Sequence, residues 1–265
     1  MNGTKTISLP GGDRSARYYQ SGKGQPLLFL HSAAGLPGFT PQLEALSRYF
    51  TVTAPLMPGF GSSGEECLHD DVLKLVFWGW DFVDALKIER PILVGHSLGG
   101  MLAAEMAATE PSRVGKLVLA APAGIWLDEH PTADFFAMTP QEIVAAAFHD
   151  PQSELARTFL AIPDNHQAAA ETTIARIKGL AAAGRFLWPL GDRGLRERLY
   201  RVRAATLLLW GDSDRIIPPI YSEAFQRELT GAASVKQQRI SAAGHELFAE
   251  QPEATITAIV NFCAS

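Results

Sequence analysis

The chain alternates between short apolar runs and longer stretches whose apolar residues recur at helical spacing. Continuous apolar runs that end at polar residues are typical of strands buried on both faces of a sheet. Such runs lie at 25–32, 51–57, 91–96, 116–123, 205–211 and, more weakly, 234–240. Helical spacing marks 38–50, 70–88, the residues from 97 onward, 218–229 and 252–265. This alternation predicts an α/β fold: a mostly parallel central sheet with helices on both faces.

One long segment, from about residue 125 to residue 202, interrupts the alternation. It contains helical patterns at 139–150, 168–184 and 196–202 and no convincing strand. A helical insertion between two strands would form a cap (lid) over one end of the sheet. We therefore expect a core made of residues 1–124 and 203–265, with residues 125–202 as the cap.

Composition narrows the class of protein. The 265 residues are 47% hydrophobic and 19% charged, which is ordinary for a globular chain with a sizeable core. Acidic residues number 28 against 23 basic ones, without a basic block, so nucleic-acid binding is not indicated. No apolar stretch reaches the roughly 20 residues of a membrane helix, and the polar N-terminus lacks a signal-peptide core. The two cysteines, Cys67 and Cys263, do not suggest a disulfide framework, so we expect a cytoplasmic protein.

The most informative motif is Gly-His-Ser-Leu-Gly at residues 95–99, which matches Gly-x-Ser-x-Gly between an expected strand and an expected helix. Side chains at the two glycines would collide where the chain folds back on itself. The helix start then offers free N–H groups and a positive dipole end beside Ser97. This environment suits an oxyanion, whereas the simpler interpretation is a Gly-Ser turn joining a strand to a helix.

A serine hydroxyl is a weak nucleophile and needs a base that is itself oriented by an acid. His245 follows the last expected strand, and Asp212 and Asp214 follow the strand at 205–211. Loops after parallel strands meet at the carboxyl edge of the sheet, where open α/β sheets bind ligands. The chain order serine, aspartate, histidine is the order given for α/β-hydrolases.

Three segments, "GHSLGG", "LWGDSDRIIPP" and "GHELFAEQPE", together resemble the α/β-hydrolase family, in particular its capped esterase-like and C–C-hydrolase-like branch. The resemblance covers roughly residues 25–123 and 204–262. It implies a catalytic triad of Ser97, His245 and an acid that usually lies three residues after the loop glycine, which favours Asp214. Asp212 would then hydrogen-bond within its loop or cap the next helix.

The resemblance also implies an oxyanion hole made by the backbone N–H groups of Leu98 and Ala33. Here the chain departs from the family, because the first oxyanion loop usually begins His-Gly and this chain has His31-Ser32-Ala33. Ser32 could narrow that loop or add a hydroxyl to it. His31 and His96 flank the proposed site and are interpreted as supports of the loop and of the elbow, not as bases.

Hydrolysis of a carboxylic ester through an acyl-enzyme on Ser97 is the reaction we expect first, with a small-molecule ester as partner and without a cofactor or metal. The alternative is hydrolysis of a C–C bond in a vinylogous diketone acid, as in meta-cleavage product hydrolases. "RFLWPL" at 185–190 is loosely similar to the cap segment of that group. Against it, the group tends to have Asn before the nucleophile and Trp after the histidine, where this chain has His96 and Glu246.

Other functions also remain open. Lactones and amides are further substrates, and a non-catalytic ligand receptor on the same fold is a hypothesis from a different class. "GFGSSG" at 59–64 matches a dinucleotide pattern, but Glu65 and Glu66 follow it and would repel phosphate. The group Cys67, His69, Asp70 and Asp71 lacks regular metal-ligand spacing and reads as a solvated helix start. Of the aromatic residues in the cap, we expect Trp126, Phe136 and Trp188 to line the substrate pocket. The sequence does not indicate an oligomeric state.

Overall fold

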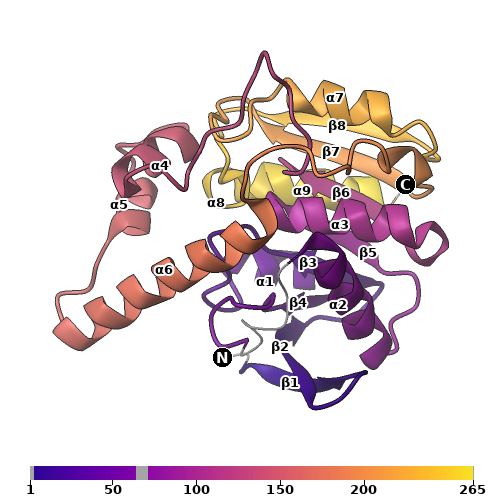
Figure 1. Ribbon diagram of the computed structural model, residues 1–265, viewed down its shortest axis with the longest axis horizontal. Coiled ribbons are helices and arrows are strands. Elements are labelled where there is room, and N and C mark those ends of the chain that lie inside the picture. The colour runs from indigo at the N-terminus through magenta and orange to yellow at the C-terminus, as the bar shows by residue number, and fades with distance from the viewer. Residues whose placement is uncertain (1–2, 64–70, 265) are drawn as a thin grey trace.

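The computed structural model describes residues 3–63 and 71–264, which form one twisted sheet flanked by helices (Figure 1). The strand order is β1-β2-β4-β3-β5-β6-β7-β8. The pairs from β4 to β8 are parallel, whereas β1 with β2 and β2 with β4 are antiparallel. The strands are β1 (Lys5–Leu9), β2 (Arg14–Ser21), β3 (Pro26–Leu30), β4 (Thr51–Pro55), β5 (Ile92–His96), β6 (Lys116–Ala120), β7 (Ala205–Gly211) and β8 (Val235–Ile240).

This architecture confirms the predicted α/β fold with a mostly parallel sheet. The sequence pattern missed β1 and β2, the antiparallel pair at one end of the sheet. Most residues of both strands are exposed or half-buried, so neither strand contains the continuous apolar run that marks a strand covered on both faces.

Helices cover both faces of the sheet because successive strand residues point to opposite sides. In β3, Leu28 and Leu30 belong to the larger core cluster, which also contains residues of α2, α3 and α7. Leu27 and Phe29 belong to the smaller cluster, with residues of α1, α8 and α9. The bounds are α1 (Pro41–Ser47), α2 (Val72–Ala85), α3 (Leu98–Thr109), α7 (Tyr221–Glu228), α8 (Leu247–Glu250) and α9 (Pro252–Ala264).

Helix α2 begins two residues later than the apolar pattern predicted. The Asp71 side chain accepts a hydrogen bond from the Lys74 N–H at 2.8 Å, so Asp71 is the N-cap and Val72 the first helical residue. The other members of the metal group considered above (Cys67, His69 and Asp70) and the last glycine of "GFGSSG" lie outside the described residues.

The predicted helical insertion lies between β6 and β7, and residues 125–202, all of them described, contain no strand. Its α-helices are α4 (Pro140–Ala147), α5 (Glu154–Leu160) and α6 (His166–Leu187). In Figure 1, α4, α5 and the first half of α6 project to the left of the sheet, while the C-terminal end of α6 returns to it. Leu199–Arg201 forms a short 3-10 turn, where the sequence suggested a longer helix.

Candidate active site

Ser97 is the residue at which β5 ends and α3 begins. Its φ is 54° and its ψ is −114°, a conformation that side-chain-bearing residues rarely adopt. Three backbone hydrogen bonds hold it: the Ser97 N–H donates to the Ala120 oxygen (2.9 Å), and the Ser97 oxygen accepts from Met101 (2.9 Å) and Ala123 (3.1 Å). The chain therefore makes a sharp, over-determined turn at Ser97.

The two glycines of the motif are required by close backbone packing. A Cβ on Gly95 would lie 2.2 Å from the Gly99 oxygen, and a Cβ on Gly99 would lie 2.1 Å from the Leu30 oxygen. No side chain fits at either distance. The absence of side chains lets the start of α3 pack directly against the end of β3, the strand that leads into Ala33.

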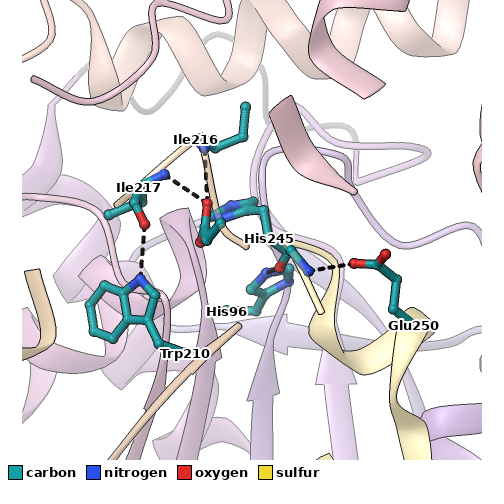
Figure 2. A network of polar contacts seen from close by, with 8 residues as sticks. His96, Trp210, Ile216, Ile217, His245 and Glu250 are labelled. Carbon is teal, nitrogen blue, oxygen red and sulfur yellow. Dashed lines mark hydrogen bonds and ion pairs between the residues drawn. The ribbon is translucent and has the colours of Figure 1, made fainter. Parts of the chain in front are cut away.

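The Nδ1–H group of His245 donates a hydrogen bond to Oδ2 of Asp214 at 2.8 Å. The other carboxylate oxygen accepts the N–H groups of Ile216 and Ile217, both at 2.9 Å (Figure 2). The two side chains are 7% and 0% exposed. The Asp214 carboxylate is therefore held in place by its own loop. In turn it holds the imidazole of His245 in the tautomer that carries the proton on Nδ1, and it makes no hydrogen bond with Nε2.

The electrostatics of the pair favour a basic imidazole. Burial disfavours the imidazolium form of His245, but the charge of Asp214 and its hydrogen bond outweigh burial, so the pKa of His245 lies above its ordinary value. Glu246 adds to this effect. The arrangement suits a group that accepts a proton and then carries a positive charge beside Asp214.

Asp212, the other candidate acid, lies elsewhere. It is exposed, and its carboxylate accepts a hydrogen bond from Ser241 Oγ at 3.3 Å. The structure thus brings Asp214, and not Asp212, to His245.

His96 links the histidine loop to the elbow. Its Nε2 donates to the main-chain oxygen of His245 at 2.8 Å, and the two ring centroids lie 5.0 Å apart. Burial, followed by the nearby His245, lowers the pKa of His96 to about 3, so it acts as a neutral donor. His245 therefore lies beside the residue that precedes Ser97. Across these described loops no hydrogen bond joins the Ser97 and His245 side chains, as is common before a substrate is bound.

His31 supports the loop that carries Ala33. Its Nδ1–H donates to the Ser32 oxygen at 2.8 Å, and Nε2 accepts the Met57 N–H at 3.1 Å. Burial lowers the pKa of His31 to about 4 and keeps it neutral. Neither histidine is placed as a base, in line with their interpretation as supports.

Two backbone donors at this edge have no protein acceptor. Within residues 3–63 and 71–264, the N–H groups of Ala33 and Leu98 donate to no other group. Leu98 is the first residue of α3, where the helix cannot supply an acceptor. Free donors in a buried elbow suit the stabilisation of a developing oxyanion.

The insertion is attached to both loops of the site through the C-terminal end of α4. The Ala147 oxygen accepts the His245 N–H at 2.6 Å. The Arg215 guanidinium donates to the Ala145 oxygen at 2.6 Å and to the Phe148 oxygen at 2.7 Å. These carbonyls would otherwise be unpaired at the end of a helix. Sequence reasoning missed this contact, because neither Arg215 nor Ala147 stands out in a pattern.

Glu250 was also missed. Its carboxylate accepts the Gly244 N–H at 2.7 Å and the His149 N–H at 2.8 Å, and thereby holds the loop before His245 (Figure 2). Its position in α8, a four-residue helix, offered no periodicity to detect.

A small cavity of about 40 Å³ opens at Ser97 and is lined mostly by apolar side chains, Trp126 among them. Phe136 and Trp188, which we expected in the pocket, instead line a separate open groove that is formed by residues of the insertion. Their rings contact each other with centroids 5.8 Å apart. Phe135 and Phe186 line the cavity in their place. Composition could not distinguish these neighbours, because which way each ring points depends on how the insertion packs.

Other sites considered from the sequence have weaker support. Within the described part of the chain, no three His, Cys, Asp or Glu side chains gather as a metal site. The described part of "GFGSSG" is a turn in which Ser63 Oγ accepts the Gly59 N–H at 2.9 Å. Among the described helices, none has the length and apolar character needed to cross a membrane.

Comparison with known proteins agrees with this architecture. A family model described as alpha/beta hydrolase fold matches residues 25–252. The chain therefore belongs to the alpha/beta hydrolase fold family. This confirms the family that the three sequence motifs suggested.

Relatives and solved structures of this family differ in the bond that they cleave. A 2-hydroxy-6-oxo-6-phenylhexa-2,4-dienoate hydrolase of Comamonas testosteroni is 28% identical over 228 residues, 76% of this chain and 75% of that protein. A pimeloyl-[acyl-carrier protein] methyl ester esterase of Vibrio campbellii is 27% identical over 263 residues, 93% of this chain and 98% of that protein. The meta-cleavage product hydrolase of Pseudomonas fluorescens IP01 superposes with a TM-score of 0.78 at 22% identity, covering 99% and 98% of the two chains.

The chain does not span all of its curated relatives. Two others are matched over only 57% and 44% of their own length.

Proposed function

We propose that this chain hydrolyses carboxylic esters through an acyl-enzyme formed on Ser97. The observation that carries the proposal is the arrangement at the carboxyl edge of the sheet. A strained Ser97 directly follows His96, whose ring donates to the main chain of His245, and the Nδ1 of His245 is bonded to the buried Asp214. Together these residues provide a nucleophile, a base and an acid that orients the base.

In this mechanism His245 Nε2 takes the proton of the Ser97 hydroxyl while Oγ attacks the ester carbonyl. The tetrahedral oxyanion accepts hydrogen bonds from the N–H groups of Leu98 and Ala33. His245 then returns the proton to the departing alcohol. A water molecule, activated by the same imidazole, releases the carboxylic acid and restores Ser97.

Residues 125–202 act as a cap in this proposal. The helix α4 is bound to the loops of Asp214 and His245, and Trp126, Phe135 and Phe186 contribute to the wall of the cavity at Ser97. The esterase of Vibrio campbellii, which aligns over 93% of this chain, supports ester cleavage as the first choice.

A second candidate is C–C bond hydrolysis of the meta-cleavage type, which the relative from Comamonas testosteroni favours. One observation weighs against it: Arg185 of the "RFLWPL" segment lines the groove that holds Phe136 and Trp188, and not the Ser97 cavity. Lactones and amides are further carbonyl compounds that the same residues could attack.

The test is hydrolysis of p-nitrophenyl esters from acetate to octanoate by the wild type, Ser97→Ala and a control, Ser222→Ala. Ser222 is a buried serine of α7 whose hydroxyl donates to the Pro219 oxygen, outside the site. We expect Ser97→Ala to lose about a thousandfold or more in kcat, whereas Ser222→Ala stays active. A fluorophosphonate should label the wild type once, on Ser97, as read by peptide mass spectrometry.

Equal activity of the wild type and Ser97→Ala would overturn the mechanism. If p-nitrophenyl esters are not cleaved but a vinylogous diketone acid is, the second candidate replaces the first while Ser97 keeps its role.

A further inference from the structure

Helix α6 has two apolar faces, and the protein covers only one of them. Its buried residues are Gly179, Ala182, Ala183, Phe186 and Leu187. A Cβ on Gly179 would lie 3.8 Å from the Ala33 oxygen, so the buried face lies over the loop of Ala33. Arg176 donates to the main-chain oxygens of Phe159 and Ala161 at 2.7 and 3.0 Å, which places the end of α5 on another side of α6. The remaining side of the helix faces solvent.

The solvent side carries a row of apolar residues, which we call the α6 seam. Its members recur at alternating intervals of four and three residues: Ala170, Ile174, Ile177, Ala181, Gly184 and Trp188. Gly184 is half-buried and the others are exposed, with Ile174, Ile177 and Trp188 at 54%, 63% and 52%. Intervals of four and three are those of the contact positions in a coiled coil. At about 1.5 Å per residue the seam is about 27 Å long, so it suits a second helix packed along it.

An open groove of about 680 Å³ follows the C-terminal half of the seam. One wall comes from the segment before α4, and the seam contributes much of the other. The lining residues include Asp134, Phe136, Ala137, Ile177, Ala181, Gly184 and Trp188. Because Ala181 and Gly184 have little or no side chain, the groove leaves room for large side chains of a partner.

The order of residue sizes makes the seam complementary to itself. Large side chains lie in its first half and small ones in its second half. If a second copy of α6 packs in antiparallel orientation, Ile174 lies opposite Gly184 of the partner, and Ile177 lies opposite the partner's Ala181. A two-fold axis repeats both contacts. Parallel packing would instead place isoleucine against isoleucine and glycine against glycine, which leaves a gap.

Charged residues beside the seam favour the same orientation. Glu171 and Arg185 each directly follow a seam residue, so they lie along one edge of it. Antiparallel packing brings Glu171 of each copy near Arg185 of the other, whereas parallel packing brings like charges together. Within the described part of the chain, Arg185 has no hydrogen bond or ion pair, and Glu171 accepts only the Gln167 amide at 3.0 Å. Lys178 lies near the two-fold axis, where its long stem lets the ammonium group extend into solvent.

We propose that two copies of this chain associate through antiparallel packing of their α6 seams, each helix lying in the groove of the other. The partner is a second copy because both the sizes and the charges along the seam complement themselves. A helix that inserts into a lipid surface needs neither an order of large and small residues nor a carboxylate beside its apolar row. The inference does not depend on the proposed ester hydrolysis.

The first test is sedimentation velocity of the full chain from about 1 to about 100 μM, because self-association follows mass action. The wild type should shift from the mass of one chain to that of two. Ile177→Glu should raise the dissociation constant about a hundredfold or more, because it buries carboxylates in the apolar seam. The matched control is Ile162→Glu, an isoleucine of the insertion that is 57% exposed and lies outside the seam, and it should behave as the wild type. Circular dichroism checks that each variant is folded.

Charge reversal tests the orientation of the two helices. Glu171→Arg and Arg185→Glu should each raise the dissociation constant about tenfold, because each turns two attractive contacts into repulsive ones. The double variant should return to within about threefold of the wild type, because both pairs are restored with their signs exchanged. In a parallel dimer the four proteins would associate equally, since like charges face each other in every one.

The inference is overturned if the wild type keeps the mass of one chain over the whole range, or if Ile177→Glu associates as the wild type does. A double variant no better than the single ones overturns the antiparallel packing. If the wild type stays a single chain but sediments with phosphatidylcholine–phosphatidylglycerol vesicles, and Ile177→Glu does not, the seam binds lipid and a second copy is the wrong partner. Loss of the proposed esterase function would leave all of these masses unchanged.

Discussion

The carboxyl edge of the sheet and the insertion differ in how firmly their side chains are held. At the edge, His31, His96, His245 and Asp214 are buried, and each has at least one hydrogen-bond partner. In the insertion, α6 leaves large apolar side chains exposed, among them Ile174 at 54% and Ile177 at 63%. The difference teaches that the groups proposed for the chemistry are fixed by the core, whereas the surface around the substrate is built from a less constrained segment.

The insertion is nevertheless joined to the core at particular points. The end of α4 is bound by Arg215 and by the main chain of His245, and Arg198 reaches Glu105 of α3. Substitutions at buried contacts and at comparable exposed positions therefore test whether the core is more sensitive than the insertion, in activity and in the free energy of unfolding.

The largest effect is expected at the edge itself. Asp214→Asn should lower kcat on p-nitrophenyl esters by about 10,000-fold, because an asparagine cannot hold His245 in the required tautomer and charge state. Asp212→Asn, two residues earlier and exposed, should retain most of the activity. Steady-state kinetics with circular dichroism as a folding control decide the point. A large loss of activity in Asp212→Asn would contradict the assignment of Asp214 as the acid.

Glycine substitutions compare packing in the two regions. Gly99→Ala should lower the free energy of unfolding by about 3 kcal/mol, because its Cβ would lie 2.1 Å from the Leu30 oxygen. Gly184→Ala in α6 meets only Phe136 at 3.6 Å and should raise the free energy of unfolding by about 0.5–1 kcal/mol. Urea denaturation measures both, and equal shifts would contradict the difference between core and insertion.

Two Arg–Glu pairs join the insertion to the core with different burial. Glu105→Gln leaves Arg198 without its carboxylate in a mostly buried pair, and should lower the free energy of unfolding by about 1–3 kcal/mol. Glu228→Gln breaks the pair with Arg196, in which the two side chains are 40% and 31% exposed, and should cost less than about 0.5 kcal/mol. The same denaturation experiment applies. If Glu228→Gln lowered the free energy of unfolding more than Glu105→Gln, burial would not determine how much these two pairs stabilise the protein.

The smallest expected effect is a shift in pH dependence. The base must be neutral to accept the Ser97 proton, so activity falls as the pH drops through the pKa of His245. Asp214, Glu246 and the neutral His96 surround this ring, and the pKa of His245 is raised above 6.5. The acidic limb of kcat/KM should therefore have its midpoint above 6.5. His149→Gln, at an exposed histidine of the insertion, should leave this limb in place, and a midpoint below 6.5 would contradict the assignment.

Much of the core could be predicted from the sequence because each of its signals is local. The apolar runs of β3 to β7 are continuous, since these strands are covered on both faces, and the glycines around Ser97 mark a turn that side chains would block. The hairpin of β1 and β2 could not be predicted in this way, because strands at the end of the sheet are partly exposed to solvent and therefore contain polar residues among the apolar ones. The short helix α8 and the contact of Arg215 with α4 depend on loops that meet only in three dimensions.

The sequence by itself determined the α/β architecture, the position of the helical insertion and the residues proposed as nucleophile, acid and base. Periodicity and the spacing of turn residues are local features of the sequence, so they can be recognised without knowing which distant segments are in contact. Only the tertiary structure showed the hydrogen bond between Asp214, which the family resemblance already favoured as the acid, and His245. It also decided that Phe135 and Phe186 line the cavity in place of Phe136 and Trp188. The pairing of Glu105 on α3 with Arg198 of the insertion was likewise decided by the tertiary structure. These outcomes depend on which side chains converge from distant segments, and no local pattern encodes that convergence.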